Sequence, residues 1–387
     1  MPSAKRKILF PITSKIHYAR QKRLLNVLHS HPRFDLQLVL GGSILAEKYG
    51  EQFFPEIRKA GFRIQDTLFN LIDGGNHVSM AKTAGLTALE FSNTIYKLNP
   101  DIVLVRGDRF EQLAIAMVAA YLNKTIVHIE GGDLSGTIDE SVRHAITKLA
   151  HAHLVTNEAS AQRVMRMGEN PDMIFNVGSL DVEFAAEVRK NPDARILRRM
   201  GTGHDINFGR PFVMVIYHPV TTEAGNRRHM EALLEAVDGL NVQALWFWPN
   251  NDAGTGEMAK AIRVWRETGK IRHNKIKFVT DVLPDDFMAI LGRSRCLIGN
   301  SSSGIKECSW LGVPAVNIGS RQQGRLRGPN VIDVPERKQA ITQAIRTQMR
   351  RGRYPASDIY YKPNTSKRIV EILEKIPLVA QKRFFEV

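Results

Sequence analysis

Short apolar segments alternate with amphipathic helical segments through almost the whole chain, and this alternation constrains the fold more than any other feature. Apolar segments such as Ile102–Arg106 and Thr125–Ile129 have the length of buried strands, and helical patterns follow them, as from Phe110 to Leu122. Buried strands separated by helices are typical of a parallel sheet that is covered on both faces. The sequence therefore predicts an α/β fold rather than a helical bundle or an all-β fold.

The predicted strands form two groups, separated by a polar segment from Val188 to Arg210 that is rich in Gly and Pro and is the best linker candidate. Two similar groups predict two Rossmann-like domains that face each other across a cleft, with boundaries at residues 1–187 and 188–365. The expected strands are Lys7–Pro11, Asp35–Leu40, Arg63–Thr67, Ile102–Arg106, Thr125–Ile129, His153–Thr156 and Ile174–Val177, followed by Phe212–Tyr217, Val242–Trp248, Lys275–Val279, Cys296–Gly299 and Pro314–Ile318.

Composition agrees with a two-domain globular protein of 387 residues, since 43% of the residues are hydrophobic and 24% are charged. The chain has no apolar run of about 18 residues, so no membrane-spanning segment is expected. The basic segment from Met1 to Lys7 lacks the features of a signal peptide. Two cysteines, Cys296 and Cys308, make neither a disulfide framework nor a metal cluster, and they predict a reducing, cytoplasmic location.

A net charge of +15 raises the question of a nucleic-acid partner. The Lys and Arg residues are scattered through the helical segments and become dense only near Arg346 to Arg353, and no aromatic nucleic-acid motif accompanies them. The sequence therefore predicts no nucleic-acid partner, and a small anionic ligand such as a nucleoside diphosphate is favoured.

Carboxylates follow two neighbouring strands of the first group. Asp108 comes after Ile102–Arg106, Glu130 comes after Thr125–Ile129, and Asp139 and Glu140 fall in the first turn of the next helix. The carboxyl ends of neighbouring parallel strands meet at one rim, where α/β proteins bind ligands. Carboxylates gathered there are expected to raise one another's pKa and to transfer protons. The alternative is that they only cap helices and offset helix dipoles, which for Glu140 is equally favoured.

Polar loops also follow the strands of the second group. His218 precedes a Pro at the end of one strand, and Asn250 lies in a polar loop after the next. The run Asn300-Ser-Ser-Ser-Gly304 precedes a helix expected from Ile305 to Leu311, and it predicts an anion site because hydroxyls and free N–H groups at a helix start bind phosphate. Glu307 could reach a ribose hydroxyl or be an ordinary helix residue, and Arg321 suits a diphosphate.

These segments together resemble the hydrolysing UDP-N-acetylglucosamine 2-epimerases, which make N-acetylmannosamine for sialic-acid-type sugars. The resemblance spans about Ile102 to Arg325 and is carried by several motifs in order. It implies a fold of the glycosyltransferase-B type, with a last helical segment, residues 366–387, that crosses back toward the first domain. The motifs are Gly107-Asp-Arg-Phe, His128-Ile-Glu-Gly-Gly, Ser135-Gly-Thr-Ile-Asp, Arg143-His-Ala-Ile-Thr-Lys-Leu-Ala-His151, His218-Pro-Val-Thr-Thr, Pro249-Asn-Asn-Asp-Ala-Gly, Gly299-Asn-Ser-Ser-Ser-Gly and Gly319-Ser-Arg-Gln.

The resemblance also implies roles for particular residues. The family's catalytic carboxylates fall on Asp108, Glu130 and Asp139, and its histidine falls on His218. Its nucleotide and diphosphate contacts fall on Arg109, Asn250, Ser301, Ser302, Glu307 and Arg321. The implied reaction is loss of the nucleoside diphosphate with removal of the proton on carbon 2, followed by addition of water to a 2-acetamidoglycal. It requires no metal or cofactor, and a homo-oligomer is expected.

Two loops depart from the family pattern. After the first strand, Lys15 stands where the family usually has an Arg, and Lys lacks the planar fork of Arg. After the second strand, Ile44 stands where a His often follows Ser. Both positions are expected to hold the sugar and the diphosphate, so the substrate could be a modified sugar, such as a 4-acetamido-6-deoxy sugar, or a GDP-linked one. A non-hydrolysing 2-epimerase, a glycosyltransferase of the same fold and a non-catalytic nucleotide-sugar-binding protein are the alternative functions.

Overall fold

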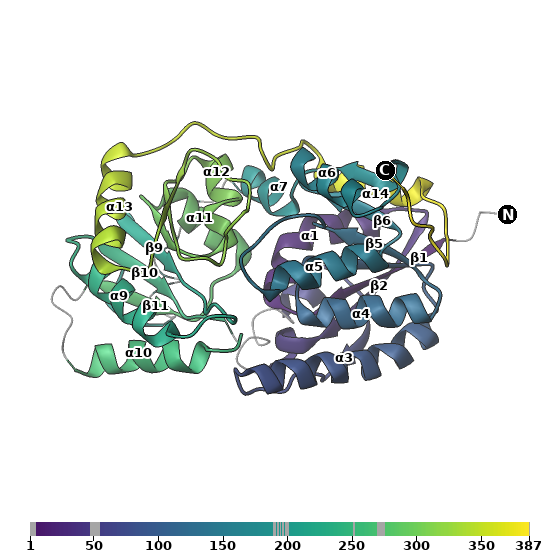
Figure 1. The fold of residues 1–387 in the computed structure, drawn as a ribbon, viewed down its shortest axis with the longest axis horizontal. Helices are drawn as coiled ribbons and strands as arrows, with labels where there is room; N and C mark the ends of the chain where they lie inside the picture. Colours follow the sequence, from purple (N-terminus) through teal and green to yellow (C-terminus); the bar gives the residue numbers. More distant parts are fainter. Residues whose placement is uncertain are drawn as a thin grey trace.

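The computed structural model describes residues 5–46, 55–188, 201–250, 252–268 and 275–386, together with residues 191, 193, 195 and 197. The chain forms two α/β halves that lie side by side, each built around its own sheet (Figure 1). The predicted α/β fold with two Rossmann-like domains is therefore confirmed.

The first sheet has seven strands in the order β3-β2-β1-β4-β5-β6-β7, and all of them run parallel. In this order β2 and β3 lie on one side of β1, and β4 and the later strands lie on the other. The strand order therefore reverses between β1 and β4, which opens a crevice at the carboxyl ends of these two strands. The strands are β1 (Arg6–Ile12), β2 (Phe34–Gly41), β3 (Ile64–Leu68), β4 (Ile102–Arg106), β5 (Thr125–Ile129), β6 (Ala152–Val155) and β7 (Ile174–Asn176).

Helices cover both faces of this sheet because successive strand residues point to opposite faces. On one face Ile8 and Phe10 pack against α1, whereas on the other Leu9 packs among residues of α3, α4 and α5. The helices of this half are α1 (Lys15–Ser30), α3 (His77–Leu98), α4 (Phe110–Tyr121), α5 (Ile138–Leu149), α6 (Glu158–Arg166) and α7 (Leu180–Glu187), with short 3₁₀ turns at Gly42–Leu45 and Pro171–Met173.

The second sheet also has seven strands, in the order β14-β13-β12-β9-β10-β11-β8. All of its strand pairs are parallel except that of β8 with β11. The strand order reverses between the neighbouring strands β9 and β12. The strands are β8 (Thr202–Gly203), β9 (Phe212–Ile216), β10 (Gln243–Phe247), β11 (Ile276–Val279), β12 (Leu297–Gly299), β13 (Ala315–Ile318) and β14 (Val331–Val334).

The helices of the second half likewise lie on both faces of its sheet. Met230 of α9 and Ile341 of α13 pack with Val213 on one face, and Leu291 of α11 packs with Met214 on the other. The elements are α9 (Asn226–Asp238), α10 (Thr255–Glu267), α11 (Pro284–Arg293), the 3₁₀ turn η3 (Ser302–Gly304), α12 (Glu307–Leu311) and α13 (Lys338–Arg351).

Two edge strands were not predicted. β8 lies within the predicted linker and pairs with β11 through only two residues, Thr202 and Gly203, so its sequence carries no alternation to recognise. β14 lies at the opposite edge and is only partly buried. The predicted domain boundaries at residues 187 and 365 stay a prediction.

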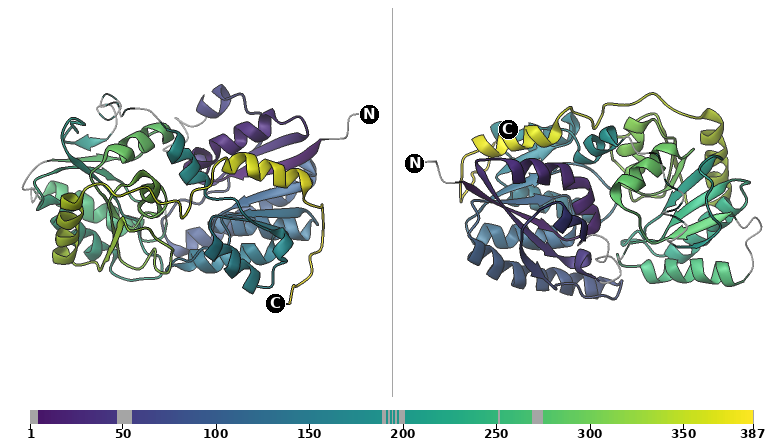
Figure 2. Two further views of the ribbon diagram at one scale, coloured as in Figure 1. Left: turned by 90° about the horizontal axis from the view of Figure 1, so that it is seen from above. Right: turned by 180° about the vertical axis from the view of Figure 1, so that it is seen from behind.

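The last helix, α14 (Thr365–Lys375), returns to the first half. Its apolar residues Ile369, Val370 and Leu373 belong to the same core cluster as Ile8 of β1, and α14 lies beside α1 (Figure 2). The helix α7 also links the two halves, because Leu180 packs in the core of the first half and Ala185 packs in the core of the second. These two helices connect the halves away from the facing strand ends.

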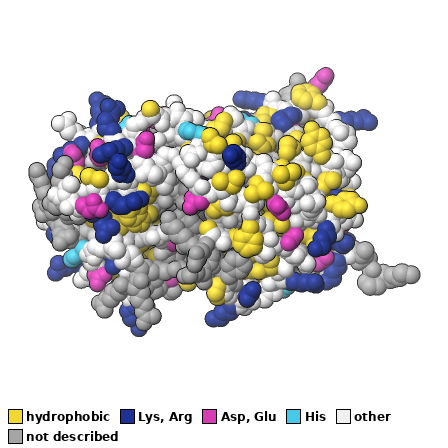
Figure 3. All heavy atoms as spheres, turned by 90° about the horizontal axis from the view of Figure 1, so that it is seen from below, with side chains coloured by type: hydrophobic (Ala, Val, Ile, Leu, Met, Phe, Trp, Pro, Cys, Tyr) yellow, Lys and Arg dark blue, Asp and Glu magenta, His cyan; other side chains and the backbone are white. Residues whose placement is uncertain are grey.

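Exposed apolar side chains gather on one surface of the first half (Figure 3). They come from one side of α3 and α4, and they are Val78, Leu89, Tyr96, Met117 and Tyr121, of which Tyr121 is 85% exposed. Among the described helices, none is both long enough and apolar enough to span a bilayer.

Candidate active site

A cavity of about 310 Å³ lies between the two halves, at the positions where both sheets reverse their strand order. Its lining includes Asp108 after β4 on one side, and His218 after β9 on the other. Nine of the eleven predicted site residues line it, so two distant parts of the chain meet as expected. These nine are Asp108, Arg109, Glu130, Asp139, His218, Asn250, Ser301, Ser302 and Arg321.

Asp108 and Glu130 lie on one rim because β4 and β5 are paired, with Arg106 opposite Ile129. The backbone turns sharply at Glu130, which has a φ of 70° in the left-handed region although it is not a glycine. At the following Gly131, a Cβ atom would lie 2.9 Å from the imidazole Nδ1 of His128. The Glu-Gly pair therefore places the Glu130 carboxylate in the cavity at some cost in backbone strain.

Asp108 is held as an anion. Its carboxylate forms an ion pair and a hydrogen bond with the Arg143 guanidinium, which reaches it from α5. Burial alone would raise the pKa of the Asp108 carboxyl, but Arg143 and then Arg325 lower this pKa to about 2. Asp108 is therefore ionised throughout the neutral range.

Asp139 has the opposite shift. It lies in the first turn of α5, whose N-cap is Thr137. Burial, and then the negative charge of Asp108, raise the pKa of the Asp139 carboxyl to about 6. A carboxyl with this pKa can accept and return a proton near neutral pH, which is the requirement for an acid–base group.

Glu130 belongs to a buried cluster of charges. Its Oε1 accepts a hydrogen bond of 3.1 Å from Arg106 and lies 3.3 Å from the Lys306 ammonium, and Arg106 also pairs with Asp181. Although burial favours the neutral acid, Arg106 and Lys306 hold the pKa of Glu130 well below its usual range. Since Lys306 comes from the second half, this cluster joins the halves at the cavity wall, which Arg106, Glu130 and Lys306 line.

The expectation that the three carboxylates raise one another's pKa is therefore wrong for two of them. Arg143 pairs with Asp108, and Arg106 pairs with Glu130, so nearby cations lower the pKa of both carboxyls. The expectation holds for Asp139, because the pKa of this residue is raised partly by Asp108.

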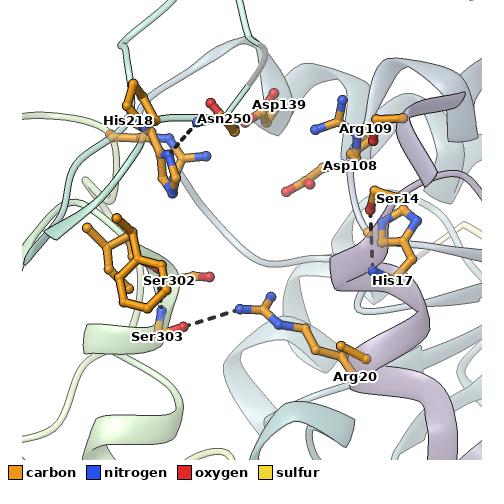
Figure 4. A pocket seen from close by; sticks show the side chains of 18 of the residues that line it. Ser14, His17, Arg20, Asp108, Arg109, Asp139, His218, Asn250, Ser302 and Ser303 are labelled. Atoms are coloured by element: carbon orange, nitrogen blue, oxygen red, sulfur yellow. Dashed lines mark hydrogen bonds between the residues drawn. The ribbon is translucent and has the colours of Figure 1, made fainter. Parts of the chain in front are cut away.

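On the wall formed by the second half, the Asn300 side chain clamps the ends of β12 and β9 together by two hydrogen bonds. Its amide oxygen accepts from the His218 backbone N–H and its amide nitrogen donates to the His218 carbonyl, both at 2.8 Å. This clamp orients His218, whose Nδ1 accepts a hydrogen bond of 3.4 Å from the Asn250 backbone N–H (Figure 4). Asn300 is fully buried, so its side chain supports the rim rather than facing a ligand.

The predicted helix from Ile305 begins later than expected, at Glu307, and the 3₁₀ turn η3 precedes it. Ser301 caps this turn, and Ser301 and Ser302 line the cavity. Arg321 lines it as well and donates a hydrogen bond of 3.1 Å to the Asn300 carbonyl. Two hydroxyls and a guanidinium on one wall can bind a diphosphate.

Glu307 is fully buried and does not line the cavity. Its Oε1 accepts from Ser303 at 3.0 Å and from Arg20 at 3.2 Å, and Arg20 also lies 3.4 Å from Asp181. The Arg20 guanidinium donates to the Ser303 hydroxyl as well (Figure 4). Its predicted contact with a ribose stays a prediction, but in this structure the carboxylate binds Arg20 of the first half.

The motif Ser135-Gly-Thr explains how the two walls meet. The Gly136 N–H donates a hydrogen bond of 3.1 Å to the Arg321 carbonyl, and a Cβ atom at Gly136 would lie 2.0 Å from the Ser320 carbonyl oxygen. Only glycine permits this approach, so the motif joins the wall that carries Asp139 to the loop that carries Arg321.

The two departures from the family pattern fall differently in the structure. The Lys15 side chain lies outside the described residues, so its role stays a prediction. Ile44 is fully buried in the core cluster of the first half, and its neighbour Ser43 lines the cavity instead. The expectation that Ile44 faces the sugar is therefore wrong, because the turn at Gly42–Leu45 directs this apolar side chain into the core.

Sequence reasoning missed several cavity residues that have no motif of their own. His17 comes from α1, Lys306 precedes α12, and Arg143 was quoted in a motif without a role. Their positions depend on packing between the halves, which spacing does not reveal.

Outside the cavity, and among the described residues, Glu223, His229 and Glu336 form a group whose ligand atoms lie within 4.8 Å of one another.

Sequence comparison finds relatives along nearly the full chain. A 34% identical protein of Legionella pneumophila, called UDP-N,N'-diacetylbacillosamine 2-epimerase (hydrolyzing), aligns over 377 residues, which are 97% of each chain. A 30% identical UDP-N-acetylglucosamine 2-epimerase of Neisseria meningitidis aligns over 98% of this chain and 99% of the relative.

Structure comparison gives the same result for the fold. The crystal structure of UDP-GlcNAc 2-epimerase from Neisseria meningitidis bound to UDP-GlcNAc superposes with a TM-score of 0.77 at 15% identity, covering 96% of this chain and 100% of the other. The family model described as UDP-N-acetylglucosamine 2-epimerase matches residues 26–374. This chain therefore belongs to the UDP-N-acetylglucosamine 2-epimerase family.

Proposed function

We propose that this enzyme is a hydrolysing 2-epimerase, which converts a UDP-linked 2-acetamido sugar and water into UDP and the free sugar inverted at carbon 2. The observation that carries the proposal is the division of the cavity. One wall holds the carboxylates Asp108 and Glu130, whose pKa values are lowered by paired cations, together with the titratable Asp139, and the other holds Ser301, Ser302 and Arg321. The carboxylates can oppose positive charge on a sugar and exchange a proton, while the hydroxyls and the guanidinium can bind its diphosphate.

The first step is elimination. The bond between carbon 1 and the UDP oxygen breaks, and its electron pair leaves with UDP, where Arg321 and the serine hydroxyls oppose the developing negative charge. Positive charge develops at carbon 1 and is opposed by Asp108 and Glu130. Asp139 takes the proton from carbon 2, and the C–H electron pair forms the double bond of a 2-acetamidoglycal.

The second step is hydration. Water adds its oxygen to carbon 1, and the proton reaches carbon 2 from the face that gives the inverted configuration. One proton is taken up at carbon 2 and one is released from the water, so the protons balance. Because inversion requires the proton to arrive on the face opposite the one that Asp139 deprotonated, the group that delivers it is not Asp139. The raised pKa of Asp139 suits the removal of the proton, whereas the lowered pKa values of Asp108 and Glu130 suit charge stabilisation.

The sugar itself has two candidates. The relative with 34% identity is named for UDP-N,N'-diacetylbacillosamine, and the relative with 30% identity is named for UDP-N-acetylglucosamine. The higher identity favours the diacetylated 4-acetamido-6-deoxy sugar, and plain UDP-N-acetylglucosamine is the second candidate.

A direct assay tests the function. The enzyme is incubated in D₂O with each UDP sugar and with the GDP counterparts, UDP release is followed, and the sugar is examined by NMR. Hydrolytic epimerisation gives one free sugar per nucleotide, inverted at carbon 2 and carrying deuterium there. A UDP-linked epimer without free sugar would instead identify a non-hydrolysing enzyme, and transfer to an added acceptor would identify a glycosyltransferase.

A homo-oligomer is also part of the proposal. The apolar surface of α3 and α4 supports it, because exposed apolar patches of this kind are typical of protein contacts. Light scattering of the wild type and of Tyr121→Asp tests whether a second copy covers this surface.

A further inference from the structure

His17 of α1 lines the cavity on the wall of Asp108 and Arg109, although no motif singled it out (Figure 4). The residue is 8% exposed, and what is exposed faces the cavity. A histidine at such a place can be a charged group, a hydrogen-bond donor or an acceptor, and its neighbours decide which.

A chain of hydrogen bonds leads to Nδ1 of this imidazole. The Arg106 backbone N–H donates to Gln112 Oε1 at 3.3 Å, so the amide nitrogen of Gln112 must be the atom that faces Thr13. This nitrogen donates to Thr13 Oγ1 at 3.3 Å. Thr13 Oγ1 also lies 3.3 Å from His17 Nδ1. The hydroxyl keeps its proton and one further lone pair for this contact, so the neutral ring carries its proton on Nε2 when Thr13 donates and on Nδ1 when Thr13 accepts.

The ring is also kept neutral. Burial, followed by the positive charges of Arg106 and Arg109, lowers the pKa of His17 to about 3, and only Asp108 acts in the opposite direction. The charged groups that face the ring are thus Arg20, Arg106, Arg109 and Asp108, and the cations outweigh the single anion. Among the described residues, none accepts a hydrogen bond from Nε2.

We propose that Thr13 donates its proton to His17 Nδ1, that the Nε2–H of His17 is therefore an uncharged, oriented hydrogen-bond donor for an acceptor oxygen on the sugar, and that His17 thereby determines sugar specificity. The position favours the sugar over the diphosphate, because His17 lies on the wall of Asp108 rather than on that of Ser301 and Arg321. A fixed N–H donor selects a carbonyl or hydroxyl oxygen, such as that of an acetamido group, and disfavours a substrate without one. The inference rests on the proposed function for the identity of the ligand.

The first test measures the tautomer without any substrate. Two-bond ¹H–¹⁵N NMR spectra of the wild type should show His17 protonated on Nε2 and bare on Nδ1 from about pH 5.5 to 8. Thr13→Val removes the donor to Nδ1 and should give a mixture of tautomers, whereas Thr13→Ser should preserve the wild-type spectrum. A proton on Nδ1, or a doubly protonated ring at pH 6, in the wild type would overturn the proposal.

The second test measures binding by calorimetry with UDP and with the UDP sugars. His17→Leu should weaken the UDP sugar by about 10-fold and leave UDP unchanged, since only the sugar contacts Nε2. His17→Gln, whose side-chain amide places a donor near the position of Nε2, should recover part of the loss. UDP-glucose, which lacks the acetamido group, shows whether the acetamido oxygen is the partner.

The outcomes of the binding test separate this inference from the proposed function. Equal weakening of UDP and the UDP sugar in His17→Leu would mean that the variant disturbs the whole site, and an unchanged UDP sugar would remove His17 from recognition. If the wild type binds UDP sugars but releases no UDP from them, the proposed function fails while the binding test still decides the role of His17.

Discussion

Asp108 and Asp139 line the same cavity with opposite shifts in pKa, to about 2 and to about 6 respectively. The difference arises because Arg143 pairs with Asp108 and leaves Asp139 exposed to the negative charge of its neighbour. One carboxylate is thus fixed as an anion, and the other is free to exchange a proton.

The pH dependence of turnover should follow Asp139. If Asp139 is the base, it must be ionised, and ionisation increases as pH rises through its pKa. We therefore expect kcat/KM to fall below about pH 6, by up to tenfold per pH unit, and to be level near pH 7. Asp108, with a pKa near 2, stays charged over this range and adds no change. Rates measured from about pH 4.5 to 8.5 at constant ionic strength check this.

Asp252→Asn provides a sharper form of the same test. The charge of Asp252 raises the pKa of Asp139, and Asp252 also lies 3.5 Å from Arg109, whose charge lowers this pKa. Removing the carboxylate should therefore move the acidic limb of the profile to lower pH. A limb that stays in place would assign it to another group, and activity that falls above pH 6 would make Asp139 the acid.

Asp108→Asn and Glu130→Gln should each reduce kcat by at least ~100-fold while UDP binding persists, because both remove a charge that opposes the cationic carbon 1. Asp172→Asn, an exposed residue of the 3₁₀ turn Pro171–Met173, is the control and should keep wild-type turnover. Stopped-flow turnover and calorimetry give the two quantities. If a variant retained more than about a tenth of wild-type activity, its carboxylate would have no part in the mechanism.

Arg321→Ala should weaken UDP by roughly 2 kcal/mol, or about 30-fold, because a charge-assisted contact to phosphate is lost. Ser302→Ala should weaken it by less, since only a neutral hydroxyl is removed. The matched control is Arg346→Ala on the outer side of α13, which tests whether net charge alone matters. Unchanged UDP affinity in Arg321→Ala would place the diphosphate elsewhere.

Gly136→Ala should impair turnover without unfolding the protein. The added methyl would lie 2.0 Å from the Ser320 carbonyl oxygen, so the loop that carries Arg321 must move away from the wall of Asp139. Gly85→Ala is the control, because a methyl there meets open space within α3. Far-UV circular dichroism and UDP affinity separate a displaced loop from a lost fold, and wild-type kinetics in Gly136→Ala would contradict the close approach.

Arg106→Ala should destabilise the protein by about 3–5 kcal/mol, because it leaves Glu130 and Asp181 buried with less positive charge beside them. Arg106→Lys should cost less but should not restore full stability, since Lys cannot donate to both carboxylates in the same geometry. Arg195→Ala, which removes only an exposed pair with Asp193, should leave stability nearly unchanged. Urea unfolding measures all three.

The sequence by itself determined the strands other than the edge strands β8 and β14, the parallel arrangement of those strands, and the rim. Apolar runs such as Ile102–Arg106 have no other stable place than a buried strand, and the glycines after them leave only a turn, so Asp108 and Glu130 had to reach one rim. The same reasoning placed His218 and Ser301 at the rim of the second sheet. Local pattern sufficed because strand ends of one parallel sheet meet whatever the rest of the chain does.

Only the tertiary structure decided the charges and the contacts at that rim. The pKa of Glu130 depends on Arg106 and on Lys306 from the other half. Ile44 turned into the core instead of the cavity, and His17 came to lie beside Thr13, which Gln112 contacts. These properties arise between residues that are far apart in the chain, such as Glu130 and Lys306, and a few ångströms apart in space. In the low dielectric of the interior, one neighbouring cation shifts the pKa of a carboxyl away from its usual value. Sequence spacing carries no record of such neighbours, because packing between the two halves brings them together.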